Sequence, residues 1–133
     1  MQVTIQIVTG LLILLCVTDG CIKAKPLTVS VVSGVYVVKY SHGTETLELR
    51  NDGIFTQRYI CPAQEQPIVN QGKWALDVVS EEVDLFDALI FDTGKNEPRN
   101  PPLKTRWLLK IIQGSGHIRI SIDPDRALLF EKQ

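Results

Sequence analysis

The chain has 133 residues, a hydrophobic fraction of 44%, and 14 basic against 15 acidic side chains. This length suits a single domain, and the hydrophobic fraction is too high for a disordered chain. The formal net charge of −1 provides no positive surface for neutralising phosphates. We therefore expect no nucleic-acid partner.

The N-terminus differs from the rest of the chain. Residues 1–18 carry no charged side chain, and residues 5–17 form an apolar run of 13 residues. This run is shorter than the ~20 residues of a membrane-spanning helix but suits the apolar region of a secretory signal. We predict that residues 1–20 are a signal peptide or membrane-anchor helix and that the protein is exported. Residues 21–33 are then a linker, and residues 34–133 form the folded domain.

The apolar segment ends at Gly20-Cys21, which resembles the processing site of lipoproteins. This resemblance implies that the Cys21 thiol carries a lipid and that the protein is held at the periplasmic face of an envelope membrane. Cleavage with secretion and an uncleaved anchor are the alternatives. If Cys21 is lipidated, Cys61 is an unpaired thiol, whereas earlier cleavage would allow these two cysteines to form a disulfide. After residue 20 the chain has 14 basic and 14 acidic residues, so it has no polybasic patch for anionic lipid.

The remaining residues alternate between polar and apolar with a period of two, which is typical of strands. The clearest hairpin joins 46–50 to 54–60 through Asn51-Asp52-Gly53, a sequence that favours a tight turn. Residues 61–71 are expected to form a polar loop. Further strands are predicted at 35–40, 72–77, 83–86 (or as far as 91), 106–112, 117–122 and 127–131.

Two segments allow other interpretations. Between Glu82 and Phe91, apolar residues also recur at helical spacing, so a helix is the alternative there. Between Asp92 and Lys104, three prolines exclude a central strand, and this stretch is expected to be irregular. With about eight strands joined mostly by short connections, a closed antiparallel barrel best avoids exposed edges. We therefore predict an all-β meander that closes into a small barrel.

The spacing of these motifs resembles small lipocalin-like β-proteins of the bacterial envelope over about residues 34–90. These families have a Gly-x-aromatic strand, a strand–Asp-Gly–strand hairpin and a Gly-x-Trp strand, here at Gly34-Val35-Tyr36, Asn51-Asp52-Gly53 and Gly72-Lys73-Trp74. The N-terminal barrel of copper-response envelope lipoproteins has the same arrangement. The resemblance implies a lipocalin-like barrel and an envelope location. Metal sensing does not follow, because this chain lacks their Cys-x-x-Cys motif.

Two sets of residues are candidates for ligand binding. The aromatic residues Tyr36, Trp74 and Trp107 could line a barrel cavity for a small apolar ligand, although inward aromatic residues can also be plain core. The loop 92–106 contains Arg99 and Arg106, which could each pair with a carboxylate or phosphate. The alternative is a solvated connection stiffened by proline.

Catalytic chemistry has weaker support. Asp92-Thr93-Gly94 matches the turn that holds the catalytic aspartate of aspartic proteases, but it occurs once and is followed by Lys95. The acidic residues Glu81, Glu82, Asp84 and Asp87 could supply paired carboxylates, or they could form a solvated strand face. We therefore assign no catalytic residue.

Metal and cofactor sites are also not expected. His42 and His117 are far apart in the sequence, and neither has an adjacent nucleophile to activate. Together with one available thiol, they do not form a metal-ligand set. We predict a non-catalytic envelope binding module that recognises a partner protein or a small apolar ligand. An envelope hydrolase using Asp92 or the carboxylates of 81–87, and a structural accessory subunit, are the alternatives.

Overall fold

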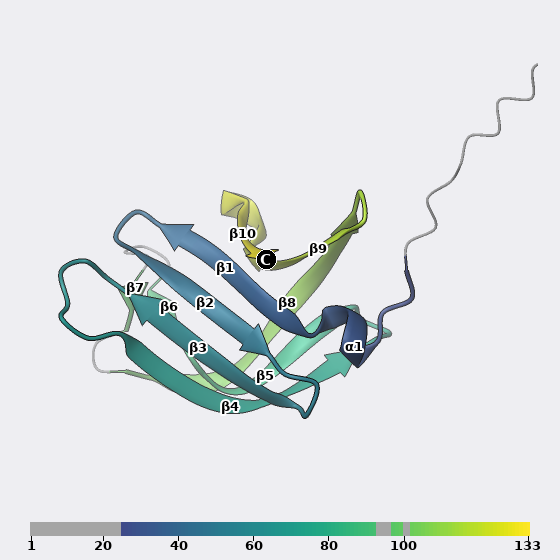
Figure 1. Ribbon diagram of the computed structural model, residues 1–133, viewed down its shortest axis with the longest axis horizontal. Helices are drawn as coiled ribbons and strands as arrows, with labels where there is room; N and C mark the ends of the chain where they lie inside the picture. Colours follow the sequence, from purple (N-terminus) through teal and green to yellow (C-terminus); the bar gives the residue numbers. More distant parts are fainter. Residues whose placement is uncertain (1–24, 93–96, 100–101) are drawn as a thin grey trace, which may run out of the picture.

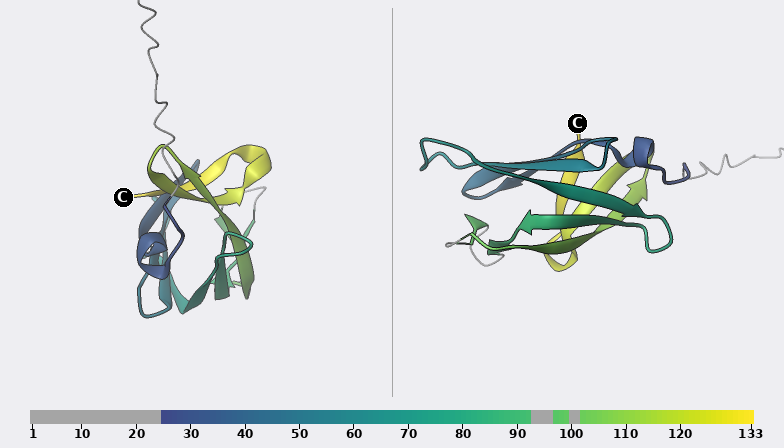
Figure 2. Two further views of the ribbon diagram at one scale, coloured as in Figure 1. Left: turned by 90° about the vertical axis from the view of Figure 1, so that its right-hand side faces the viewer. Right: turned by 90° about the horizontal axis from the view of Figure 1, so that it is seen from below.

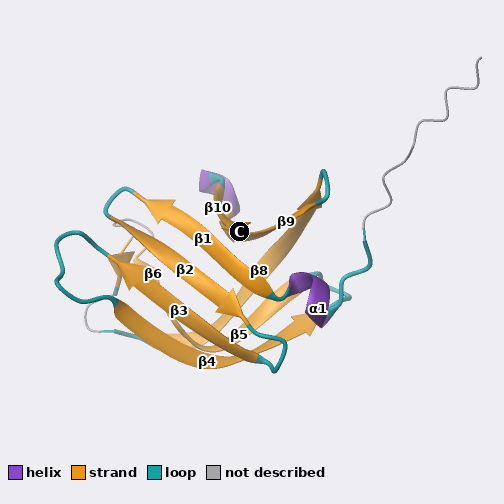
Figure 3. Ribbon diagram, viewed as in Figure 1, coloured by secondary structure: helices purple, strands orange, loops and turns teal. Residues whose placement is uncertain are grey.

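The computed structural model describes residues 25–92, 97–99 and 102–133. Eight antiparallel strands form a closed barrel in the order β1-β10-β9-β8-β5-β4-β3-β2 (Figures 1 and 3), which confirms the predicted all-β barrel. Figure 2 shows the strands arranged around the interior. The barrel strands are β1 (Gly34–Tyr40), β2 (Gly43–Leu49), β3 (Ile54–Ile60), β4 (Ile68–Asp77), β5 (Glu82–Leu89), β8 (Lys104–Gly114), β9 (His117–Asp123) and β10 (Leu128–Lys132).

The β2–β3 hairpin forms as the sequence predicts. Gly53 has a φ of 81°, a conformation that glycine adopts without steric cost, and the Asp52 carboxylate accepts a hydrogen bond from the Ile54 amide at 3.2 Å. Leu49 then lies opposite Phe55, and both side chains are fully buried. The turn therefore sets a register that directs alternate side chains of both strands into the barrel.

The barrel interior is filled mainly by apolar side chains. Each strand contributes alternate residues, as expected for a sheet with one solvated face. A chain that folds back on itself in this way buries its apolar surface around a single core. The largest fully buried apolar side chains are Tyr36, Phe55, Phe130, Leu47, Leu49, Leu85, Leu109 and Ile120.

Several strands are longer than the sequence pattern predicts, and β2 begins at Gly43 instead of residue 46. β4 begins at Ile68 instead of residue 72, so the prediction of a polar loop over 61–71 is wrong for its last residues. They pair with β3, and polar Asn70 is buried in the interior, so apolar alternation does not mark this part of the strand. β8 begins at Lys104 instead of residue 106 and pairs with the end of β5.

The helical alternative for 82–91 is wrong, because β5 is hydrogen-bonded between β4 and β8. Its register shifts between Leu85 and Ala88, and Asp87 has a φ of 63°, which marks a β-bulge. Val83 and Leu85 point inward before the bulge and Ala88 after it. The extra residue changes the spacing of buried apolar positions from two to three, whereas Phe86, which the helical interpretation would bury, is exposed.

The stretch predicted to be irregular contains a small two-stranded sheet. β6 (Phe91–Asp92) pairs with β7 (Glu97–Pro98), and both lie within the connection from β5 to β8. The Arg99 amide donates to the Ile90 carbonyl at 3.0 Å, and the Ile90 amide donates to the Leu103 carbonyl at 3.0 Å. These bonds fix the described ends of this connection to β5.

The predicted linker contains the short helix α1 (Val29–Val32). Thr28 caps α1, because its hydroxyl accepts a hydrogen bond from the Val31 amide. Leu27 and Val32 are buried with the barrel core, so this segment covers one end of the barrel (Figures 1 and 2). Residues 1–20 and Cys21 lie outside the described residues. Among the described residues, no helix is long and apolar enough to span a membrane.

Candidate functional site

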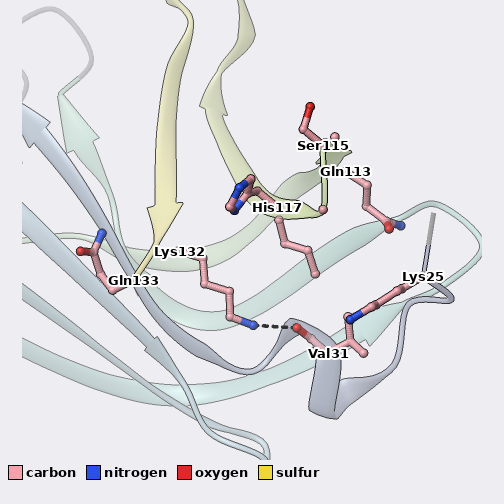
Figure 4. Close-up of a pocket in the computed structure, with 10 residues that line it drawn as sticks. Lys25, Val31, Gln113, Ser115, His117, Lys132 and Gln133 are labelled. Carbon is pink, nitrogen blue, oxygen red and sulfur yellow. Dashed lines mark hydrogen bonds between the residues drawn. The ribbon is translucent and has the colours of Figure 1, made fainter. Parts of the chain in front are cut away.

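A groove of about 750 Å³ lies between α1 and the tip of the β8–β9 hairpin (Figure 4). This volume falls within the range of sites that hold a small ligand, roughly 300–1,000 Å³. We call it the α1 groove. It is lined by Lys25, Val31, residues 113–118, Lys132 and Gln133.

The hairpin turn shapes one wall of the α1 groove. Gln113 pairs with Ile118 and Gly114 with His117, and the two turn residues Ser115 and Gly116 have φ values of 50° and 78°. Two consecutive positive φ angles are typical of a type I′ turn, which matches the natural twist of the strands. The turn therefore places Gln113, Ser115 and His117 across from Lys25 and Val31, as Figure 4 shows.

Lys132, at the end of β10, forms part of the opposite wall. Its Nζ atom donates a hydrogen bond to the Val31 carbonyl at 2.7 Å and lies 5.6 Å from the centre of the Tyr36 ring. A Cβ on Gly34 would lie 2.6 Å from Cε of Lys132, so the lysine stem occupies the space that glycine leaves open. Burial lowers the pKa of Lys132, because removal from water disfavours its charged form.

The charged side chains that line the α1 groove have one sign. Lys25 and Lys132 line it, and none of its lining residues is aspartate or glutamate. Neither lysine forms an ion pair within the described part of the chain. An anionic group in this groove would therefore meet two ammonium groups without competition from a carboxylate side chain in the lining.

A second concentration of polar groups lies inside the other end of the barrel. Glu45 is fully buried, and its carboxylate accepts hydrogen bonds from the Tyr40 hydroxyl at 2.6 Å and the Gln57 amide at 2.9 Å. Gln57 in turn accepts from Asn70 at 3.0 Å and from the Leu89 amide at 2.8 Å. We call Tyr40, Glu45, Gln57 and Asn70 the interior polar cluster. It connects four strands of the barrel through side chains.

Burial dominates the electrostatics of the interior polar cluster. It raises the pKa of Glu45 to about 7, although the hydrogen bonds from Tyr40 and Gln57 oppose this shift. Burial, followed by the nearby charge of Glu45, raises the pKa of Tyr40. Glu45 has no ion pair with any described residue. Binding a proton is therefore the main way in which the negative charge of the Glu45 carboxylate is neutralised.

The aromatic residues predicted to bind a ligand lie in or against the core. Tyr36 is fully buried and donates to the Val32 carbonyl, and its ring lies beneath Lys132 beside the α1 groove. Trp74 is buried, and its indole nitrogen donates to the Arg50 carbonyl at 2.8 Å. Trp107 is half-buried against the core. The structure does not bring these three residues together in the α1 groove.

The two arginines predicted to bind an anion lie away from the α1 groove. Arg106 already has an anionic partner, because its guanidinium group donates to both carboxylate oxygens of Asp84 at 2.6–3.1 Å. The same group lies 5.4 Å from the centre of the Phe86 ring. Arg99 is exposed, and Lys95 lies outside the described residues. Arg106 therefore stabilises the outer surface of β5 and β8 as an ion pair and a cation–π contact.

The acidic residues considered for catalysis are dispersed. Asp84 is held by Arg106, whereas Glu81 and Asp87 are exposed at a turn and at the bulge. Asp92 lies in β6, and Thr93-Gly94 falls outside the described residues.

Cysteine and histidine residues lie at separate places. Cys61 and His42 line a shallow pocket of about 520 Å³ beside the β1–β2 turn, whereas His117 lines the α1 groove. Cys61 is free, and its predicted alternative pairing with Cys21 involves a residue that is not described. No three His, Cys, Asp or Glu side chains in the described ranges are close enough together to hold a metal ion.

Two residues that were not predicted as site residues nevertheless carry a signal in the sequence. Glu45 precedes Leu47 and Leu49 with a spacing of two, which places its carboxylate on their inward face. Lys132 follows Phe130 with the same spacing. Lys25 carries no such signal, because its position depends on how the segment before α1 packs.

Comparisons with protein-family models, with curated proteins and with solved structures found no match. Function must therefore be inferred from the arrangement of the side chains.

Proposed function

We propose that the protein is a non-catalytic binding module that holds a small, mainly apolar ligand in the α1 groove. The observation that carries this proposal is the groove itself, a concave site between α1, the β8–β9 hairpin and the end of β10. Its wall combines the side chains of Val31 and Ile118 with a few polar groups at fixed positions. Such a combination is typical of small-molecule sites, where apolar contacts supply affinity and polar groups supply orientation.

We further propose that the barrel is lipocalin-like and that the protein is exported and tethered at an envelope membrane through Cys21. The apolar run of residues 5–17 and the Gly20-Cys21 sequence support this location. An envelope binding module would meet apolar ligands close to the membrane. The intact mass of membrane-extracted protein tests the tether, because lipidation requires Cys21 at the N-terminus with an added acyl mass.

Blocking the α1 groove tests the binding function. Gln113 is half-buried and lines the groove, so Gln113→Trp should fill it and weaken binding of the neutral lipophilic dye Nile red by about tenfold or more. Gln71→Trp is the matched control, because Gln71 is exposed on β4 and does not line the groove. Dye fluorescence measures both affinities. If wild type does not bind the dye, or binds it as tightly after Gln113→Trp, the proposed function is wrong.

A further inference from the structure

We infer that the α1 groove selects a single-chain amphiphile with one anionic head group, of the class of fatty-acid carboxylates, and that Lys132 binds this head group. The inference rests on the proposed function and specifies the ligand of the same site. It follows from the position of Lys132, the charge of the groove, its apolar surface and its location in the chain.

Lys132 is a cation whose charge is only partly compensated. Its ammonium group is partly removed from water, and its one described hydrogen bond goes to the neutral Val31 carbonyl. An ammonium group has three N–H donors, so further donors remain for a ligand. A carboxylate beside it would restore the favourable interaction lost with water, and hydrogen bonds between charged groups are stronger than neutral ones.

The surroundings of Lys132 favour an anion over a neutral or cationic head group. Lys25 adds a second positive charge to the groove lining, which includes no acidic side chain. In Figure 4, Lys25, Val31 and Lys132 lie together beside α1. The two lysines would repel a cationic ligand, and a neutral ligand would leave their charges uncompensated.

The remaining groove surface fits an alkyl chain. Val31 and Ile118 contribute apolar side chains, and the methylene stem of Lys132 packs beside them. The groove volume of about 750 Å³ suits one small ligand rather than a flat contact with a membrane. The expected ligand therefore lies with its chain along the groove and its carboxylate at Lys132.

The location of the groove is consistent with a ligand taken up near a membrane. Lys25 lines the groove and is only four residues after Cys21 in the sequence, the residue through which we propose the membrane tether. After residue 20, however, the chain has equal numbers of basic and acidic side chains and no polybasic patch. These facts favour a single released amphiphile over an anionic membrane surface as the ligand.

Three probes with the same twelve-carbon chain test the head-group preference: dodecanoate, 1-dodecanol and dodecyltrimethylammonium, each below its micelle concentration. Displacement of Nile red from the wild-type protein gives their affinities. We expect dodecanoate to bind about tenfold more tightly than dodecanol, and dodecyltrimethylammonium to bind most weakly. Equal affinities, or tighter binding of the cationic probe, would overturn the inference while leaving the binding function intact.

Charge-removing variants locate the head group. Lys132→Gln should weaken dodecanoate binding by about tenfold and change dodecanol binding by less than about twofold. Lys25→Gln, at an exposed position, should show the same selectivity with a smaller effect. Lys73→Gln is the control, because Lys73 is exposed on β4 away from the groove.

Two outcomes contradict the role of Lys132. One is an equal loss of dodecanoate and dodecanol affinity in Lys132→Gln with no selective loss in Lys25→Gln, which would indicate only damage to the fold. The other is binding to phosphatidylglycerol vesicles without binding of monomeric dodecanoate, which would identify a membrane surface as the ligand. Absence of Nile red binding would instead contradict the proposed function.

Discussion

At the scale of single residues, Glu45 is the clearest departure from an apolar core. Uncharged groups surround it: Tyr40 from β1 and Gln57 from β3 donate to it, and Gln57 is held by Asn70 from β4 and the Leu89 amide from β5. No described cation neutralises Glu45. Because burial raises its pKa to about 7, the folded protein holds this proton more tightly than the unfolded chain does.

This proton linkage predicts that the protein loses stability as the pH rises from about 4.5 to neutral. The contribution of Glu45 is fully present below its ordinary pKa of 4.5 and is lost as the pH rises through about 7. Between pH 4.5 and 8 the wild-type free energy of unfolding should fall by an amount on the order of 3 kcal/mol. In Glu45→Gln, which keeps the size of the side chain but cannot ionise, this contribution should be absent. Urea unfolding followed by tryptophan fluorescence measures both curves.

The control for this prediction is Glu48→Gln, on the same strand at an exposed position. This variant should retain the wild-type pH dependence, and Glu45→Gln should be the more stable of the two at pH 8. Equal slopes for all three proteins between pH 4.5 and 8 would show that the Glu45 carboxyl is not buried as described.

At the scale of elements, local sequence predicts strands well where each strand has one apolar face. The β2–β3 hairpin and β9 follow from alternation and turn residues. The ends of β3 and β9 are within one residue of those predicted, whereas β2 begins three residues earlier than predicted. The predicted strand is too short where polar residues point inward, as at Asn70 in β4. In β5 the strand forms, but the bulge at Asp87 interrupts the two-residue alternation of inward and outward side chains. In both cases pairing with neighbouring strands overrides the local pattern.

The strands β3, β4 and β5 approach one another closely at Gly72. A Cβ at this position would lie 2.3 Å from the Phe86 carbonyl oxygen and 2.7 Å from the Phe55 ring. Since the carbonyl belongs to the bulged strand and the ring to the packed core, neither can move easily. We expect Gly72→Ala to lower the free energy of unfolding by about 2 kcal/mol, measured by urea denaturation.

The matched substitution is Gly114→Ala, where the nearest atom, on Arg119, is 3.9 Å from the added Cβ. Its effect on unfolding should be within about 0.5 kcal/mol. If both substitutions have the same small effect, the close contact of β4 with Phe55 and Phe86 is incorrect.

At the scale of the whole molecule, closing the barrel creates the candidate site. β1 and β10 share two register pairs, whereas β1 and β2 share seven. The seam where the first and last barrel strands meet is therefore short. Contacts with Val31 and Val35 extend it, because Lys132 donates to the Val31 carbonyl and the Gln133 amide donates to the Val35 carbonyl at 2.9 Å. The α1 groove lies beside this seam.

This origin explains which parts of the site the sequence could predict. Alternation predicts the barrel and could have placed Glu45 and Lys132 on inner faces. The α1 groove combines Lys25, residues 113–118 and Lys132, which are far apart in the sequence and meet only when the ends of the barrel close. The predicted aromatic residues and arginines carried clear local signals. Such signals do not show that the Trp74 indole already donates to the Arg50 carbonyl or that Arg106 is already paired with Asp84.

The most direct measurement is a titration of isotopically labelled protein with monomeric dodecanoate, followed residue by residue through backbone amide chemical shifts. A ligand in the α1 groove should shift the amides of Val31, residues 113–118 and Lys132, and leave residues 41–44 and 60–63 at the other end of the barrel unchanged. Shifts concentrated at that other end, or no saturable shifts at all, would contradict the proposed site.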